Sequence, residues 1–371
     1  TLLLGRDGSV WAFGDNTYGQ LGTGDTENYY GRVVQVLKGA GTGFSTNEKD
    51  GKYLTDIIQI AADGNQSMAL RADGTVWTWG ENTTGQLGME AVSHSTVPVQ
   101  VVKSVMDEDG TYLEQQNFYL NNIFQIAAGA GFALAAGLRT INGETEALAF
   151  AWGDDANGRL GIGDLLSADG KSSTYIPQVV LNEDGSDYLT GVRQVAAGAD
   201  HSLAVVEDTL TLKDGSTVTD SAVMGWGSNI NGQLGMNRKG EIRVDLPVKM
   251  LQGGTISGLD NVSTDQPPHA RENLTLAAGD QFSIVVREEG SVWGTGLNDT
   301  AQGGNTHRDD TQLLAQVGNG NYYSLEIGGK PFNGNDAYEI RNASDVVEQG
   351  GKMPRSVTLE ADEQLWINKN A

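Results

Sequence analysis

The stretch VWTWGENTTGQLG at residues 76–88 decides the fold, because the chain carries it in several copies. Related phrases lie at residues 10–22, 150–161, 224–235 and 292–304, with a shorter echo, LWIN, at 365–368. All seven tryptophans fall in these phrases. A second marker, a pair of alanines after a short apolar run, recurs at 61–62, 127–128, 196–197 and 277–278. In repeat proteins each unit buries its apolar faces against its neighbours. We therefore predict a repeat architecture.

Each repeat has the pattern of short strands joined by tight turns. Runs of about four to seven residues rich in Val, Ile and Trp are broken by Gly, Asn and Asp-Gly, and no stretch keeps a helical apolar period. Side chains alternate along a strand, so the two tryptophans of VWTWG share one face and Val76 and Thr78 the other, and both faces are expected to be buried. Sheets covered on both faces without helices must pack against other sheets, and a ring of small sheets achieves this with short edges. We predict an all-β fold: a β-propeller of about six blades, or seven if residues outside this fragment complete the ring.

The predicted repeat units divide the chain as one domain. They are residues 1–60, 61–126, 127–195, 196–276 and 277–349, with a partial unit at 350–371. Residues 323–371 match the pattern only loosely, so they form either a degenerate unit or the start of a further small β-module. The chain begins at Thr1 inside a predicted strand, and we expect it to be part of a longer protein with flanking domains.

The Gly-x-Asn-x-x-Gly-Gln-Leu-Gly part of the phrase predicts a loop that plugs the core between blades. Its Asn or Asp can bond its own turn, at positions 16, 82, 155, 229 and 298. Its leucine is the expected plug, at positions 21, 87, 160 and 234. In the fifth unit the leucine is replaced by Gly303, so we expect that blade to be the loosest.

These motifs in fixed order resemble the regulator of chromosome condensation repeat family. The resemblance rests on Ala-Ala-Gly-x-x-His-Ser-Leu-Ala at residues 196–204, the Asp-Gly turns at 7–8 and 73–74, and the Trp-Gly-x-Asn-x-x-Gly-Gln-Leu-Gly phrase, and it covers residues 2 to about 317. It implies a propeller, typically of seven blades. Family members include a nuclear exchange factor for a small GTPase, inhibitors of β-lactamase and many surface or secreted bacterial proteins, and none is an enzyme by virtue of the repeat. The resemblance therefore implies a platform for a partner.

The units differ from the usual family repeat by long insertions before the Ala-Ala strand. Three inserts share a phrase: DGKYLTDI from residue 50, DGTYLEQQ from 109 and DGSDYLTGV from 184. Their tyrosines, Tyr53, Tyr112 and Tyr188, are one candidate recognition surface, because exposed tyrosines give a large contact area at small entropic cost.

The pair before the second strand is a competing candidate surface, because it varies while its surroundings do not. The candidate partner-binding residues there are Gln66, Phe132, Asp200, His201, Gln281 and Phe282. Corners of successive blades meet on one rim, where these residues would form a polar and aromatic patch. His201 has two interpretations, a corner residue hydrogen-bonded to backbone or a ligand contact.

Composition excludes several functions. The net charge is −24, from 48 acidic and 24 basic residues, which disfavours nucleic acid as a partner. No apolar run is long enough to span a membrane. The chain has no cysteine, and its four histidines show no metal-ligand spacing, so we expect no catalytic, cofactor or metal site. Together with the Asn-, Gly- and Thr-rich composition, this favours an extracellular or cell-surface bacterial protein.

We therefore expect a non-enzymatic module that binds a protein or a surface glycan through one rim. An intracellular regulator that contacts a small GTPase is the main alternative. A glycan-active propeller enzyme, which would need a carboxylate pair in a pocket, is the third.

Overall fold

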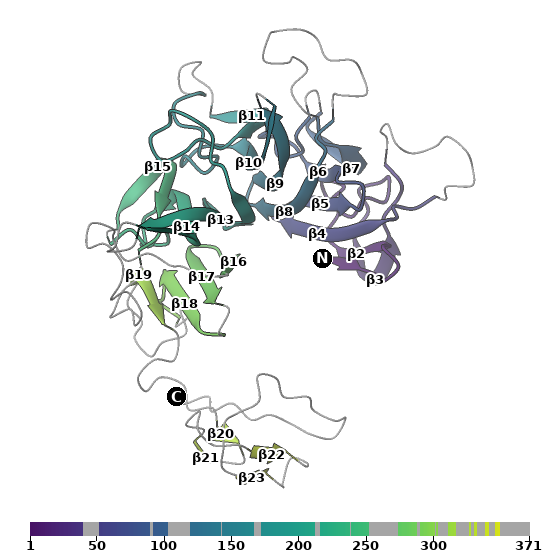
Figure 1. Cartoon of the computed structure of the whole chain (residues 1–371). Helices are drawn as coiled ribbons and strands as arrows, with labels where there is room; N and C mark the ends of the chain where they lie inside the picture. Colours follow the sequence, from purple (N-terminus) through teal and green to yellow (C-terminus); the bar gives the residue numbers. More distant parts are fainter. Residues whose placement is uncertain are drawn as a thin grey trace.

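All elements of the described chain are β-strands, and none is a helix. The computed structural model describes residues 1–39, 52–89, 92–102, 119–141, 143–166, 172–211, 216–237, 239–251, 274–287, 290–300, 302 and 311–316, together with four short strands between residues 326 and 348. The strands form one three-stranded and four four-stranded antiparallel sheets, which follow one another around a shared centre (Figure 1). The prediction of an all-β propeller is confirmed, and about six blades is consistent with these five sheets.

Each sheet is one blade, numbered here in chain order. Blade 1 contains β1 (Leu2–Leu4), β2 (Val10–Gly14) and β3 (Tyr29–Gln35). Blade 2 contains β4 (Ile57–Asp63), β5 (Gln66–Arg71), β6 (Val76–Glu81) and β7 (His94–Gln100). Blade 3 contains β8 (Ile123–Gly129), β9 (Phe132–Ile141), β10 (Glu144–Asp154) and β11 (Ser173–Val179). Blade 4 contains β12 (Val192–Ala197), β13 (His201–Thr211), β14 (Thr217–Asn229) and β15 (Glu241–Lys249). Blade 5 contains β16 (Leu274–Ala278), β17 (Phe282–Arg287), β18 (Val292–Gly296) and β19 (Thr311–Gln316).

Two small hairpins follow blade 5 in the chain. One pairs β20 (Glu326–Ile327) with β21 (Lys330–Pro331), and the other pairs β22 (Tyr338–Ile340) with β23 (Val346–Glu348). The last echo of the repeat phrase, at 365–368, and Gly303 lie outside the described residues.

The antiparallel order of the strands gives the propeller two distinct rims. The first strands of successive blades contact one another, β4 with β8, β8 with β12 and β12 with β16. In blades 2 to 5 the corner between first and second strand and the loop between third and fourth strand lie at the same end of the blade. We call this end the corner rim. The Asp-Gly hairpins and the inserts between blades lie at the opposite end, the hairpin rim.

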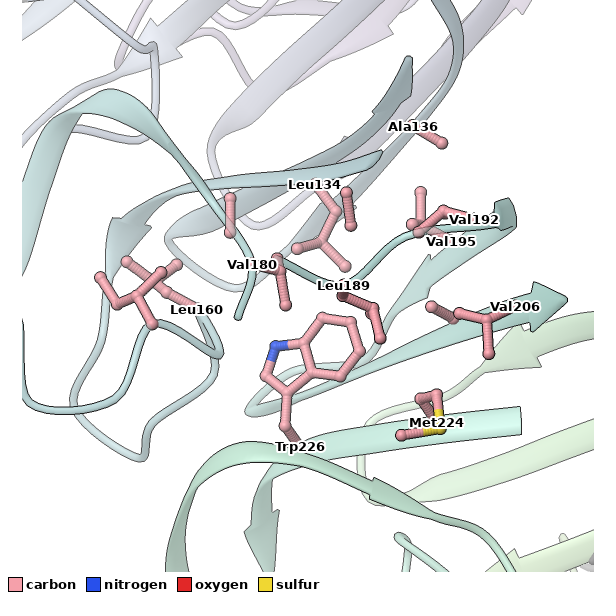
Figure 2. Packing of buried hydrophobic residues seen from close by; sticks show 14 of the residues in the cluster. Leu134, Ala136, Leu160, Val180, Leu189, Val192, Val195, Val206, Met224 and Trp226 are labelled. Carbon is pink, nitrogen blue, oxygen red and sulfur yellow. The ribbon is translucent and has the colours of Figure 1, made fainter. Parts of the chain in front are cut away.

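Blades 2, 3 and 4 bury both faces, one against each neighbour. Val76, Trp77, Thr78 and Trp79 of β6 are all fully buried, as the alternation predicted. Trp77 and Trp79 pack with residues of blade 1, while Val76 packs with residues of blade 3. The interface between blades 3 and 4 repeats this pattern around Trp226 (Figure 2). Burial of large apolar side chains between blades is therefore what holds the sheets together.

The leucine plugs are confirmed in all four blades that carry them. Leu21, Leu87, Leu160 and Leu234 are at most 1% exposed. The backbone N–H of each leucine donates to the side chain five residues earlier, over 2.8–3.0 Å, in the pairs Leu21–Asn16, Leu87–Asn82, Leu160–Asp155 and Leu234–Asn229. In these four blades the loop thus has the same geometry, which comes from one internal hydrogen bond and one buried leucine.

Candidate functional site

The Gln-Leu-Gly loops dock on the next blade at the corner rim. The carbonyl of Gln20 in blade 1 accepts hydrogen bonds from Ser67 Oγ and Trp79 Nε1 of blade 2, both 2.8 Å. The carbonyl of Arg159 in blade 3 likewise accepts from Ser202 Oγ and Trp226 Nε1 of blade 4, at 2.6 and 2.9 Å. The tryptophans therefore combine apolar burial with a polar link between blades.

Three of the predicted partner-binding side chains are buried between blades. Gln66 Nε2 donates to the carbonyls of Gly129 and Phe132 in blade 3, at 3.2 and 2.6 Å. Phe132 is fully buried, with the guanidinium of Arg159 5.5 Å from its ring centre. His201 is fully buried and its Nε2 lies 3.0 Å from Ser283 Oγ of blade 5. These side chains join blades and do not form an exposed patch in this structure.

The partner of His201 differs from the expected one. We expected a backbone hydrogen bond, whereas the structure gives a side-chain hydroxyl. Ser283 Oγ donates its hydrogen to the carbonyl of Gln233, 2.7 Å away, so it must accept from His201. The ring therefore carries its proton on Nε2, and Nδ1 is left as an acceptor. Burial lowers the pKa of His201 to about 4, so the ring is neutral at pH 7.

The other three predicted residues, Asp200, Gln281 and Phe282, are only partly buried or lie at the surface of the corner rim. Gln281 Oε1 accepts from Asn231 Nδ2 at 2.6 Å, and Phe282 folds its ring over Gly279. The side chain of Asp200 is 20% exposed. Binding of a partner at the corner rim stays a prediction, and only these residues and the corner backbone can reach a partner directly.

The corners of successive blades approach closely because they contain glycine. A Cβ on Gly129 would come 2.6 Å from the carbonyl oxygen of Gly198, and a Cβ on Gly198 would come 2.4 Å from that of Gly279. In blade 2 the position of these glycines is occupied by Asp63. The corners therefore form a tight inner edge on the rim, with side chains only where the repeat departs from glycine.

Arg159 is a corner-rim residue that the sequence did not single out. It stands where the other loops have glutamine: Gln20, Gln86, Gln233 and Gln302. Each of those glutamines accepts a backbone N–H of its own loop, whereas Arg159 Nη1 donates to the carbonyls of Ala130 and Ala199, at 3.0 and 3.1 Å. Arg159 thus joins the corners of blades 3 and 4.

Three carboxylates from different blades converge on the corner rim. Burial raises the pKa of Asp63 in blade 2 and of Asp200 in blade 4. The charge of Asp280 in blade 5 raises both pKa values further, and the Asp280 carbonyl accepts from the N–H of Ala199, the residue before Asp200, at 3.2 Å. Hydrogen bonds from Ser228 and Gln233 and the charge of Arg159 lower the pKa of Asp200 but do not reverse the shift. The centre of this rim is therefore an acidic site with incompletely compensated charge.

Four buried side-chain atoms on the corner rim have no hydrogen-bond partner within the described part of the chain. They are Gln66 Oε1, Arg159 Nε, Asp200 Oδ1 and His201 Nδ1. His201 Nδ1 and Asp200 Oδ1 are 3.9 Å apart, and the lone pair on Nδ1 gives the carboxylate no donor. Buried polar atoms are usually paired, so this group requires an explanation.

Two of the predicted insert tyrosines, Tyr53 and Tyr188, lie on the hairpin rim. Tyr53 forms a β-bridge with Leu37 and Tyr188 forms one with Leu181. The third equivalent is Tyr119, which bridges Val102, and not Tyr112, which lies outside the described residues. Each bridging tyrosine is followed three positions later by a residue with positive φ: Asp56, Asn122 and Gly191. The predicted alignment of the second insert was therefore out of register. Tyr119 was recognisable only from its fixed distance to the Ala-Ala strand.

The hairpin rim also carries a bulge at the start of three first strands. The register shifts within β4, β8 and β12 skip Ile58, Phe124 and Arg193. Ile58 is 57% exposed and Phe124 is 42% exposed. A bulge re-aims the extra side chain. A cavity of about 380 Å³ beside Phe124 and Arg193 reaches blade 5 at Leu274 and Thr275.

The glutamine after each bulge ties neighbouring first strands together. Gln59 bonds both backbone groups of Ile126, through Nε2 to the carbonyl at 2.8 Å and through Oε1 from the N–H at 3.0 Å. Gln194 does the same with Leu276, at 3.3 and 3.0 Å. Gln125 accepts from Val195 N–H at 2.7 Å. These side chains satisfy backbone groups at the inner edge of each sheet, which would otherwise lack partners.

Neither rim of the described structure assembles a metal-binding group, because no three His, Cys, Asp or Glu side chains there come close enough. The described residues also include no helix that is long and apolar enough to cross a membrane.

Comparison with protein families explains this architecture. The Regulator of chromosome condensation (RCC1) repeat matches residues 7–70, 73–136 and 147–205, half of the chain, and a second description of the same repeat matches 57–86 and 275–302. The chain belongs to this family. The matched segments run from blade 1 into the second strand of blade 4 and include the first three strands of blade 5, so the resemblance seen in the motifs is confirmed.

Individual relatives match the chain either at low identity or over a short segment, and the match covers only a small share of each curated relative. E3 ubiquitin-protein ligase HERC2 of Mus musculus is 24% identical over 304 residues, which cover 81% of this chain and 5% of that protein. X-linked retinitis pigmentosa GTPase regulator of Homo sapiens is 40% identical over 101 residues, covering 27% of this chain and 9% of that protein. The crystal structure of human WBSCR16 superposes with a TM-score of 0.55 at 19% identity, over 85% of this chain and 64% of that one. The chain thus spans a small part of these curated relatives, and the structural likeness concerns the fold.

Proposed function

We propose that this propeller is a non-enzymatic binding module that holds a protein partner against its corner rim. The observation that carries the proposal is the half-buried group of Asp200, Gln281 and Phe282 on this rim, together with the unpartnered polar atoms of Gln66, Arg159, Asp200 and His201 buried there. Gln59 of the first strand in blade 2, by contrast, uses both its amide nitrogen and its amide oxygen in hydrogen bonds to blade 3. An interface that leaves such groups open costs stability, and binding a partner compensates for it.

Site-specific photo-crosslinking tests this assignment. A photoreactive phenylalanine analogue replaces Asn65 or Gln281 on the corner rim, Tyr53 or Tyr188 on the hairpin rim, and Tyr175 on β11 as a control. In cells that express the protein we expect one partner to be captured from both corner positions and not from Tyr175. Capture from the tyrosine positions alone would place recognition on the inserts and refute the corner-rim assignment.

The nature of the partner and its compartment form a separate proposal. We infer an extracellular or cell-surface bacterial protein that meets a protein, or a surface glycan, outside the cell. The acidic, cysteine-free composition supports this location, as do the secreted members of the family. Protease digestion of intact cells checks it: degradation of the propeller without lysis is expected, and full protection would contradict the proposal.

A regulator that contacts a small GTPase is the second candidate. The similarity of 101 residues to a protein named as a GTPase regulator favours it. Nucleotide-exchange and binding assays against a panel of purified small GTPases separate the two candidates, since a surface module would neither bind them nor change exchange rates.

A further inference from the structure

The acidic centre of the corner rim has the chemistry of a cation-binding site. Asp63, Asp200 and Asp280 stand at the corners of blades 2, 4 and 5, which are far apart in sequence. The corners meet through backbone contacts: Gln66 of blade 2 bonds the carbonyl of Gly129, Gly129 lies against Gly198, and the N–H of Ala199 donates to the carbonyl of Asp280 at 3.2 Å. Arg159 is the cation that acts on Asp200, and it is already bonded to the carbonyls of Ala130 and Ala199. The site therefore keeps an excess of negative charge.

Asp200 receives hydrogen bonds from Ser228 and Gln233, but two other buried acceptors of the corner rim have no donor within the described part of the chain. His201 is fully buried and gives its single ring proton to Ser283, so its Nδ1 faces Asp200 as an acceptor. Gln66 is 2% exposed and uses its amide nitrogen on two carbonyls, which leaves its Oε1 unpartnered. The surplus acceptors match a ligand that brings several N–H groups and a positive charge.

We propose that the centre of the corner rim takes up one basic side chain, a lysine ammonium or an arginine guanidinium, of a protein partner between Asp63, Asp200 and Asp280. The inference rests on the proposed function and specifies the chemistry of its site. A bound metal ion is a poorer match, because these carboxylates do not approach one another closely enough to ligate one. An ammonium or guanidinium is larger and binds through separate hydrogen bonds, which suits carboxylates spread around a rim.

The first test compares two triple variants with the same change in net charge. D63N/D200N/D280N removes the proposed site, and E144Q/E183Q/D187N removes three exposed or half-exposed carboxylates near the hairpin rim. The probe is a labelled tetra-arginine peptide, followed by fluorescence anisotropy at low and at physiological salt. A tetra-citrulline peptide, which has the shape of the probe but no charge, is the ligand control.

We expect the corner-rim triple to weaken tetra-arginine binding by at least about tenfold and the hairpin-rim triple by less than twofold. Equal losses in both variants would show general attraction to an acidic protein and overturn the proposal, as would unchanged binding by the corner-rim triple. The variant should fold, because it removes carboxylates that repel one another. If it does not, Asp280→Asn alone is used, since Asp280 is exposed, and a loss of at least threefold is expected.

Failure of this inference is distinguishable from failure of the proposed function. If a partner crosslinked from Gln281 still bound D63N/D200N/D280N with full affinity, the corner rim would remain the binding surface, and the inference that it takes up a basic side chain would be refuted. A partner crosslinked only from the insert tyrosines would refute both the corner-rim function and the inference about a basic side chain.

Discussion

Truncating one leucine plug measures how much a single loop contributes to the joint between blades. Leu87 is fully buried, and both its backbone groups are held: its N–H donates to Asn82 Oδ1, and its carbonyl accepts from Thr78 Oγ1 at 2.7 Å. Leu87→Ala removes three carbon atoms, which corresponds to about 2.4 kcal/mol of transfer free energy at ~0.8 kcal/mol for each carbon. Because the hydrogen-bonded loop cannot collapse into the space, a cavity contribution adds to this, and we expect a total loss of about 3–4 kcal/mol in the free energy of unfolding.

Urea unfolding followed by tryptophan fluorescence gives this quantity directly, because the buried tryptophans lie at the same joints. The matched control is Leu165→Ala, at a leucine that is 56% exposed, where a change within about 0.5 kcal/mol is expected. A loss below about 1 kcal/mol for Leu87→Ala, or equal losses for the two variants, would refute the idea that the loop leucine holds neighbouring blades together.

Two further predictions concern other links between the blades. Burial lowers the folded pKa of His201 to about 4, so acidification from pH 6.5 protonates the ring in the unfolded chain first and in the folded chain only as the pH reaches about 4. Stability therefore falls by roughly 3 kcal/mol over this range. His201→Gln should remove that part of the pH dependence. The opposite contribution of Asp200 stays, because its raised pKa makes the fold more stable as the pH falls. If the difference in free energy of unfolding between wild type and His201→Gln were the same at pH 6.5 and pH 4, the buried neutral ring would be contradicted. Gln194→Ala deletes two hydrogen bonds to Leu276 and should cost about 1–3 kcal/mol, whereas Gln178→Ala, whose amide bonds within its own strand, should cost less than half as much, as measured by urea unfolding.

Features fixed within one repeat were predictable from the sequence. The buried strand at residues 76–79 follows from side-chain alternation, and the plug at Leu87 follows from a local loop that bonds itself through Asn82. Both recur in copy after copy, so the pattern could be recognised several times. The register of the second insert was missed because Tyr112 follows an Asp-Gly phrase like that before Tyr53, while the bridging residue is Tyr119. Only pairing across the insert distinguishes the two.

Features that depend on two blades together could not be derived from one repeat. Arg159 occupies a loop position where glutamine is usual, and its role comes from the carbonyls of Ala130 and Ala199 in two other corners. The effect of the Asp280 charge on the pKa of Asp63 likewise needs the ring, because more than two hundred positions separate the two residues in the sequence. Such contacts have no signature in the spacing of motifs.

The corner positions show why variation between repeats does not by itself mark a recognition surface. Gln66 faces blade 3, where Ala133 offers no hydroxyl, and it bonds the carbonyl of Phe132 instead. His201 faces blade 5, where Ser283 supplies a hydroxyl, and it bonds that group. Each corner side chain is thus matched to the neighbour it meets, and because every joint in the ring unites a different pair of blades, the residue varies while its task stays the same. A corner position can serve a partner only where negative charge or hydrogen-bond acceptors remain without a counterpart in the neighbouring blade. At the corner rim these groups lie around Asp200.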